Sequence, residues 1–226
     1  MANLIELSGE INFYTDEEDR FRSDNASFSI NDDLVVFNNN VKHVRGNSII
    51  TADESKIRNN FDHVVYKGNV STFYIIDLFM LKIFFITLFS ILFINATNAE
   101  QIKIISDKLE IIRAENISIF SGNVYAIEGN LEIWSEKLIM TSSNDETEVE
   151  EINAHGNVKI VREELSISGD RAQYDPIQNK LIVFNKVEVI QNRSIIMCDK
   201  IIVDLENSSS IMSSESNKRV EALIIN

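Results

Sequence analysis

The stretch FSGNVYAIEGNLEIWSEKLIM, residues 120–140, contains one full copy of the repeat that decides the fold of this chain. Its anchor is Val124, which follows a Gly-Asn dipeptide. Eleven residues after the anchor comes a small residue followed by an acid, Ser135-Glu136, and sixteen residues after it an apolar one, Met140. Apolar and polar residues alternate around the anchor, and this period of two predicts strands with one buried and one solvated face.

The same pattern recurs through most of the chain. Equivalent anchors stand 29 or 34 residues apart within each stretch, with a looser copy at Ile11; they are Val41, Val70, Val158 and Val187. The small-acid pair recurs as Ala52-Asp53, Gly169-Asp170 and Cys198-Asp199. All seven glycines fall at three positions of the repeat, where they indicate turns or bulges. A repeat of this size cannot bury its own apolar face, so we expect neighbouring repeats to stack, with two or three short strands in each.

Composition supports an all-β reading and excludes some functions. The chain of 226 residues is 44% hydrophobic, so it can bury a core, and Pro176 is its only proline. Its net charge of −14 argues against binding to nucleic acid, whose phosphates require a basic surface. Cys198 is the only cysteine, which excludes an internal disulfide framework.

A long apolar segment interrupts the repeat in the middle of the chain. Residues 73–94 are almost wholly apolar, and the small residues up to Ala99 resemble a cleavage site, with Lys82 as a minimal basic flank. This layout predicts a secretory signal peptide cut after Ala99, and hence a soluble domain starting near Glu100. A membrane anchor and a buried core helix are the alternatives, because about 20 apolar residues can span a bilayer.

The repeat itself breaks at this segment. Val70 has no small-acid pair at the usual distance, and the pair Ser106-Asp107 has no anchor of its own at the usual distance. We therefore expect one β-unit to stop and another to start, as at a junction of two proteins. The predicted divisions are a β fragment over 1–72, the apolar segment over 73–99 and a β domain over 100–226.

The repeated acids permit a catalytic or calcium-binding interpretation, but a structural one is stronger. An acid at the same place in every repeat serves the repeat, most simply by accepting hydrogen bonds from turn amides. No calcium-loop, GxSxG, HExxH or phosphate-loop motif occurs. We expect no enzymatic activity, no catalytic residue, no metal site and no cofactor. Cys198 occupies the small-residue position of the repeat, and is expected to be structural.

With these motifs, the chain resembles the OstA-like family of lipopolysaccharide-transport proteins. Residues 80–226 are similar to its LptA branch, in the order of an apolar leader followed by S-D-K-L (106–109), F-S-G-N-V (120–124), A-H-G-N-V (154–158) and S-G-D-R-A-Q-Y-D (168–175). Residues 1–72 are similar to the C-terminal part of its LptC branch, through V-V-F-N-N-N-V (35–41) and T-A-D-E-S-K-I (51–57). We expect residues 1–72 to lack the N-terminal anchor and first strands of that branch.

The resemblance implies a V-shaped, incompletely closed β-jellyroll of stacked antiparallel strands that transports lipopolysaccharide from the inner to the outer membrane. The acyl chains of lipid A would lie in an apolar groove. From the alternation we expect ten residues to face this groove: Phe120, Val124, Ile133, Leu138, Ile160, Ile167, Tyr174, Leu181, Val183 and Val187.

The resemblance also implies partners and a location. The partners would be lipopolysaccharide, other β-jellyroll modules of the export bridge, and its inner- and outer-membrane components. We expect domain 100–226 in the periplasm, or held at the inner membrane through 73–94 if that segment is not cleaved. Head-to-tail homo-oligomers would form by pairing of the outermost strands, expected at Gln101–Ile105 and Val220–Ile225. The alternatives are a structural or adhesive β-solenoid without lipid, and a polysaccharide-cleaving β-helix enzyme.

Overall fold

The computed structural model describes residues 4–15, 19–29, 31–59, 61–75, 101–143, 149–192, 194–207, 209–214 and 219–223. Within them, fourteen antiparallel strands form one sheet in sequence order from β1 to β13, and β14 pairs with β12 beside β13. A short 3-10 helix, η2 (Arg113–Glu115), follows β6. The strands are β1 (Leu4–Tyr14), β2 (Arg20–Ser29), β3 (Leu34–Arg45), β4 (Ser48–Arg58), β5 (His63–Ile75), β6 (Gln101–Ile112), β7 (Ile117–Glu128), β8 (Leu131–Ser142), β9 (Val149–Arg162), β10 (Leu165–Asp175), β11 (Lys180–Gln191), β12 (Ser194–Asp204), β13 (Ser209–Ser213) and β14 (Glu221–Leu223).

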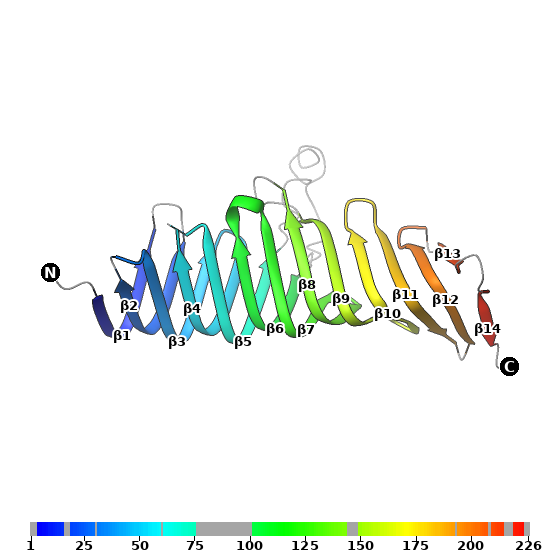
Figure 1. The fold of residues 1–226 in the computed structure, drawn as a ribbon, viewed down its shortest axis with the longest axis horizontal. Coiled ribbons are helices and arrows are strands. Elements are labelled where there is room, and N and C mark those ends of the chain that lie inside the picture. The colour runs from blue at the N-terminus through cyan, green and yellow to red at the C-terminus, as the bar shows by residue number, and fades with distance from the viewer. Residues whose placement is uncertain are drawn as a thin grey trace, which may run out of the picture.

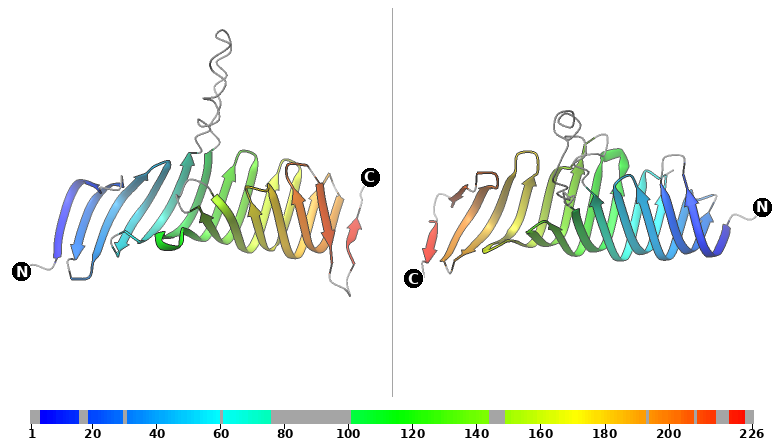
Figure 2. Two further views of the ribbon diagram at one scale, coloured as in Figure 1. Left: turned by 90° about the horizontal axis from the view of Figure 1, so that it is seen from above. Right: turned by 180° about the vertical axis from the view of Figure 1, so that it is seen from behind.

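The strands stack along one long axis, with the N-terminal strands at one end and the C-terminal strands at the other (Figures 1 and 2). Two layers of strands face each other along this axis. The sheet does not close into a barrel, because β1 pairs only with β2 and the far end of the sheet is formed by β13 and β14. The predicted fold class, a repetitive and incompletely closed β-jellyroll, is confirmed.

Each repeat contains two long strands where short ones were expected, and a bulge before each anchor explains their length. Between β7 and β8 the register shifts between Ser121 and Val124, where Gly122 and Asn123 have φ values of 77° and 46°. Two consecutive left-handed residues bend the strand, so that it continues into the second layer without a loop. Glycine and asparagine occupy these positions because they adopt positive φ most readily.

The bulges line up as a corner at which the two layers meet, and we call the layers walls 1 and 2. An inward-facing register row of wall 1 includes Phe21, Ile50, Ile104, Ile133, Ile160 and Ile167. The corresponding row of wall 2 includes Phe37, Tyr66, Leu109, Phe120, Leu138 and Val183. Both rows belong to one buried apolar core. Opposite the corner, the hairpin ends of the two walls approach each other along a line that we call the seam. Asp19 and Arg113 meet on this line, and so do Leu165 and Leu205.

The expected break between two β-units is not present in the sheet. Strand β5 pairs with β6 from His63↔Ile112 to Ile75↔Gln101, so the strands on either side of the apolar segment are direct neighbours. Val70 stands opposite Ser106, as Val124 stands opposite Ser135. Val70 thus lies where the anchor of Ser106-Asp107 belongs, because the interruption falls inside a hairpin and strand pairing restores the register across it.

Residues 76–100, which contain most of the segment predicted as a signal peptide or anchor, lie outside the described residues. Strand β5 ends at Ile75, three residues into the range assigned to that segment. Within the described ranges, no helix has the length and apolar character needed to cross a membrane.

Candidate functional site

The repeated acids hold the bulges together. In five repeats the carboxylate accepts a hydrogen bond from the side chain that precedes the next anchor. The pairs are Asn40 with Asp24 (2.7 Å), Asn69 with Asp53 (3.0 Å), Asn123 with Asp107 (2.8 Å), Asn157 with Glu136 (2.6 Å) and Lys186 with Asp170 (3.4 Å). A Cβ atom on Gly122 would lie 2.4 Å from Oδ2 of Asp107, so the glycine makes room for this contact. The acids therefore act in folding, through side-chain amides and one lysine in place of the expected turn amides.

The ten residues predicted to face a groove all point into the interior. Each is at most 8% exposed and belongs to the apolar core. Ile160, Ile167 and Leu181 also line a crevice at the seam, whereas the other seven pack against neighbouring core side chains. Contact of these residues with a lipid stays a prediction.

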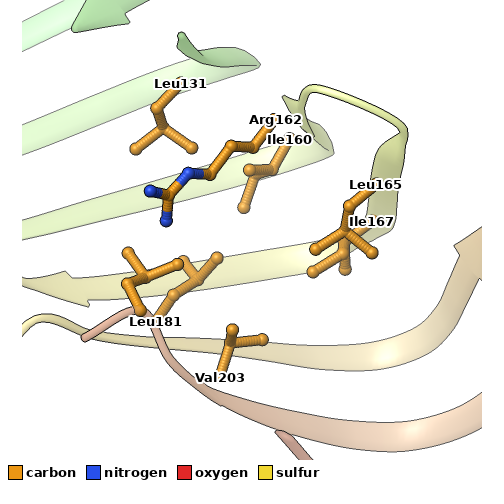
Figure 3. A pocket seen from close by; sticks show the side chains of 8 residues that line it. Leu131, Ile160, Arg162, Leu165, Ile167, Leu181 and Val203 are labelled. Atoms are coloured by element: carbon orange, nitrogen blue, oxygen red, sulfur yellow. The ribbon is translucent and has the colours of Figure 1, made fainter. Parts of the chain in front are cut away.

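The crevice lies where the ends of walls 1 and 2 meet in the C-terminal half of the molecule. Figure 3 shows the Arg162 side chain among the leucine side chains that surround the crevice. The lining is otherwise aliphatic and comes from β8 to β12 and the turn after β12: Leu131, Ile160, Arg162, Leu165, Ile167, Leu181, Val203 and Leu205.

A larger cavity of about 620 Å³ adjoins the crevice and shares Arg162, Leu165, Val203 and Leu205 with it. Its remaining lining comes from the turn after β9 and from β11 to β13: Glu163, Glu164, Val189, Gln191, Ile201, Asp204, Ser209, Ser210 and Met212. Its size is within the range of small-molecule sites, and about half of its lining residues are polar or charged. The lining joins aliphatic side chains to a rim of three carboxylates and one guanidinium, so it can accommodate an apolar chain attached to a polar group.

The N-terminal half has a different interior, with a polar cluster that we call the clasp: Asp19, His43, Tyr66 and Arg113. Asp19 is 1% exposed, and its Oδ1 lies 2.6 Å from Nε2 of His43 and 3.0 Å from Nη2 of Arg113. The Tyr66 hydroxyl contacts Nδ1 of His43. Arg45 adds a contact of 3.3 Å to Oδ2 of Asp19.

The protonation states of the clasp follow from burial and hydrogen bonding. Burial lowers the pKa of His43, although the hydrogen bond to Asp19 opposes that shift. A neutral His43 can donate from Nε2 to Asp19 and accept the Tyr66 hydroxyl proton at Nδ1, which satisfies both ring nitrogens. Burial raises the pKa of Asp19, but the hydrogen bond from His43 and the charge of Arg113 outweigh it, and the pKa is lowered overall. Asp19 is therefore a buried carboxylate with charged and neutral donors around it.

Sequence reasoning found the inward-facing core and missed the polar groups. Arg162, Leu205 and the charged rim stand at hairpin turns, where the repeat makes no demand on side-chain type. The clasp combines residues up to 94 positions apart, and Asp19 lies outside the small-acid pattern. Leu131 and Leu165 are apolar residues beside the alternating positions, but the pattern did not indicate that they line an opening.

The expected assembly edges require one correction. Gln101–Ile105 is part of β6, which pairs with β5 on one side and β7 on the other, so it is not an edge. The N-terminal edge of the described sheet is β1, on which Leu4, Ile5 and Leu7 are exposed. At the other end, Glu221–Leu223 forms β14 and lies beside β12, as the predicted C-terminal strand requires.

Part of the chain is similar to known proteins. Residues 103–209 match the family described as LptA/(LptD N-terminal domain) LPS transport protein. A solved structure of LptH, the LptA-homologous periplasmic component of the lipopolysaccharide transport device of Pseudomonas aeruginosa, matches with a TM-score of 0.50 and 15% identity. The match covers 55% of this chain and 95% of LptH, and at this identity it shows a shared fold. No curated protein sequence matches the chain.

Proposed function

We propose that the chain is a member of the OstA-like family of lipopolysaccharide-transport proteins, and that it holds the acyl chains of lipopolysaccharide without catalysing a reaction. The observation that carries the proposal is the C-terminal cavity, which joins an aliphatic interior to a charged rim. The transport would take place in the periplasm, between the inner and the outer membrane.

Burial of acyl carbon is the source of affinity in this proposal. The chain has a net charge of −14, so an anionic lipid is repelled at long range. Each methylene group removed from water contributes about 0.8 kcal/mol, and a few acyl chains can outweigh that repulsion. Arg162 is the cation of the cavity lining, and we assign it to a phosphate group of the lipid.

Photocrosslinking tests the lipid-binding proposal. A benzophenone amino acid at Leu205, in the cavity lining, is expected to capture lipopolysaccharide, whereas the same group at Lys159, on the outer side of wall 1, is not. Equal labelling at both positions, or no labelling at Leu205, would contradict the proposal. A protein that folds and binds no lipid would instead be a structural β-solenoid.

The two open ends of the sheet support a proposal for assembly with other β-jellyroll modules. Unpaired strand edges are templates for further strands. Pairing of β1 on one molecule with the β13 and β14 end of another would be heterologous and would give head-to-tail chains. Sedimentation velocity over a wide concentration range tests this, and Ile5→Pro, which places a proline in β1, should shift the protein toward monomer.

A further inference from the structure

We infer that the clasp ends the lipid path inside this chain, so that acyl chains are held in the C-terminal half and enter it sideways through the seam. This inference rests on the proposed lipid-binding function. It differs from a groove that runs uninterrupted through the stacked strands. In the N-terminal half a buried ion pair, Asp19 with Arg113, joins the two walls at the seam, and the residues that line the C-terminal openings have no such pair.

The clasp connects the two walls across the interior and at the seam. Asp19 and His43 belong to wall 1, since Asp19 precedes β2 and His43 lies in the inward row with Phe21 and Ile50. Tyr66 lies in the inward row of wall 2, and Arg113 follows β6 at the end of that wall. The contacts from Tyr66 to His43 and from Arg113 to Asp19 therefore each cross from one wall to the other.

Packed aromatic rings occupy the space beside the clasp. Phe21 stacks on His43 with ring centroids 3.9 Å apart, and on Phe37 with centroids 4.9 Å apart. At the seam, Phe61 stacks on Phe13, and the Arg113 guanidinium lies 5.9 Å from the Phe61 ring. An acyl chain passing here would have to displace these rings and separate Asp19 from Arg113 inside the protein. Separation removes the nearer of the two guanidinium groups from a buried carboxylate and leaves it only the longer contact to Arg45, which is strongly unfavourable.

Among the residues that line its openings, the seam of the C-terminal half has no comparable buried ion pair between the two walls. Leucines from both walls meet there, and the one cation of the crevice lining is Arg162. The cavity of about 620 Å³ lies on the same side, between β9 and β13. An acyl chain can reach this interior between Leu165 and Leu205 without breaking an ion pair of the clasp type. The difference between the two halves of the seam therefore determines that acyl chains bind in the C-terminal half and that they enter from the side, through the seam.

The experiment uses the full chain with a benzophenone amino acid at one of three positions: Leu205 at the C-terminal seam, Phe61 at the N-terminal seam, and Lys159 on the outer surface. The probe is purified lipopolysaccharide in detergent. We expect labelling at Leu205 to exceed labelling at Phe61 by at least tenfold, with Phe61 close to the Lys159 background. In the D19N/R113Q variant, which neutralises both charges together, labelling at Phe61 should rise several-fold and labelling at Leu205 should stay the same.

A matched control is E10Q/R22Q, which removes an ion pair between β1 and β2 at the surface. Its partners are 61% and 65% exposed, so it should leave labelling at Phe61 unchanged. Tyr66→Phe provides a milder opening of the clasp if D19N/R113Q does not fold. Similar labelling at Phe61 and Leu205 in the unmodified protein would overturn the inference and leave lipid binding intact. Absence of labelling at Leu205 would instead overturn the proposed function.

Discussion

The strands before and after the apolar segment are built from one repeat, yet their interiors differ in kind. In the described part of residues 4–75 the buried interior contains stacked phenylalanines and a tyrosine beside aliphatic residues, and its buried charged or polar side chains are Asp19, Ser23, His43, Ser55 and Thr72. In residues 101–223 it is mainly isoleucine, valine and leucine, with serines at Ser106 and Ser135 as its buried polar side chains among those described.

The difference shows that the repeat determines the backbone and leaves the interior open to change. The bulges of Gly68-Asn69 and Gly122-Asn123 have nearly the same φ values and the same contact to an acid, Asp53 or Asp107. The inward positions need only alternate and fill space, so one half can be closed by rings and charges while the other keeps an aliphatic opening. The same backbone thus supports an N-terminal half closed by the clasp and a C-terminal half with the proposed binding cavity.

Removal of the clasp cation should have the largest effect on stability. Arg113→Met leaves Asp19, which is 1% exposed, without its cross-wall cation. We expect the free energy of unfolding to fall by about 3–5 kcal/mol, as for other buried ion pairs broken on one side. Arg22→Met, which removes a partner of an exposed pair, should cost less than about 1 kcal/mol. Urea unfolding monitored by circular dichroism measures both, and equal losses would show that the clasp does not hold the N-terminal half.

Alanine at the bulge glycines should destabilise both halves alike. At Gly68 and Gly122 the φ values are 74° and 77°, and a Cβ atom would lie 2.3 Å and 2.4 Å from the Oδ2 atoms of Asp53 and Asp107. Strain and collision together should lower the free energy of unfolding by about 2–3 kcal/mol at either position. Gly129→Ala has a φ of 57° but open space, so about 1 kcal/mol is expected there. A clear difference between Gly68→Ala and Gly122→Ala would mean that the bulges are not equivalent.

Acid should weaken the N-terminal half through His43. Its pKa is lowered by burial below the ordinary value of 6.5, so the unfolded chain binds the proton more readily. The contribution of neutral His43 is therefore present above pH 6.5 and is lost as the pH falls through the lowered pKa, with a slope of at most about 1.4 kcal/mol per pH unit. Asp19, whose pKa is also lowered, adds a second loss only below pH 3.8. Unfolding midpoints measured from pH 8 to pH 3 should show the first loss in the unmodified protein and not in His43→Gln.

The sequence was sufficient for the features that recur and insufficient for those that occur once. Alternation around Val124 and its equivalents placed all ten selected residues inside, because a strand with period two has only two faces. The pairing of Val70 with Ser106 could not be predicted from spacing, since 35 residues separate them and the register is restored by the sheet. The contact of Asp19 with Arg113 depends on how the two walls meet at the seam, and no local pattern encodes it.

The smallest expected effect comes from making the N-terminal interior more like the C-terminal one. Thr72 is fully buried between Ile50 and Ile104 in the inward row of wall 1, and its hydroxyl has no hydrogen-bond partner among the described residues. Thr72→Val keeps the shape and removes the unsatisfied hydroxyl, so the free energy of unfolding should rise by about 1 kcal/mol. Ser106→Ala is the control, because the Ser106 hydroxyl is buried but donates to the Lys108 carbonyl at 3.1 Å, and its loss should destabilise by about 1 kcal/mol. Urea unfolding should therefore show a rise in the free energy of unfolding for Thr72→Val and a fall for Ser106→Ala. This result would show that the Thr72 hydroxyl is tolerated and the Ser106 hydroxyl is required. A loss of stability in Thr72→Val would instead show that the hydroxyl has a role in the N-terminal interior, and that its polar character extends beyond the clasp.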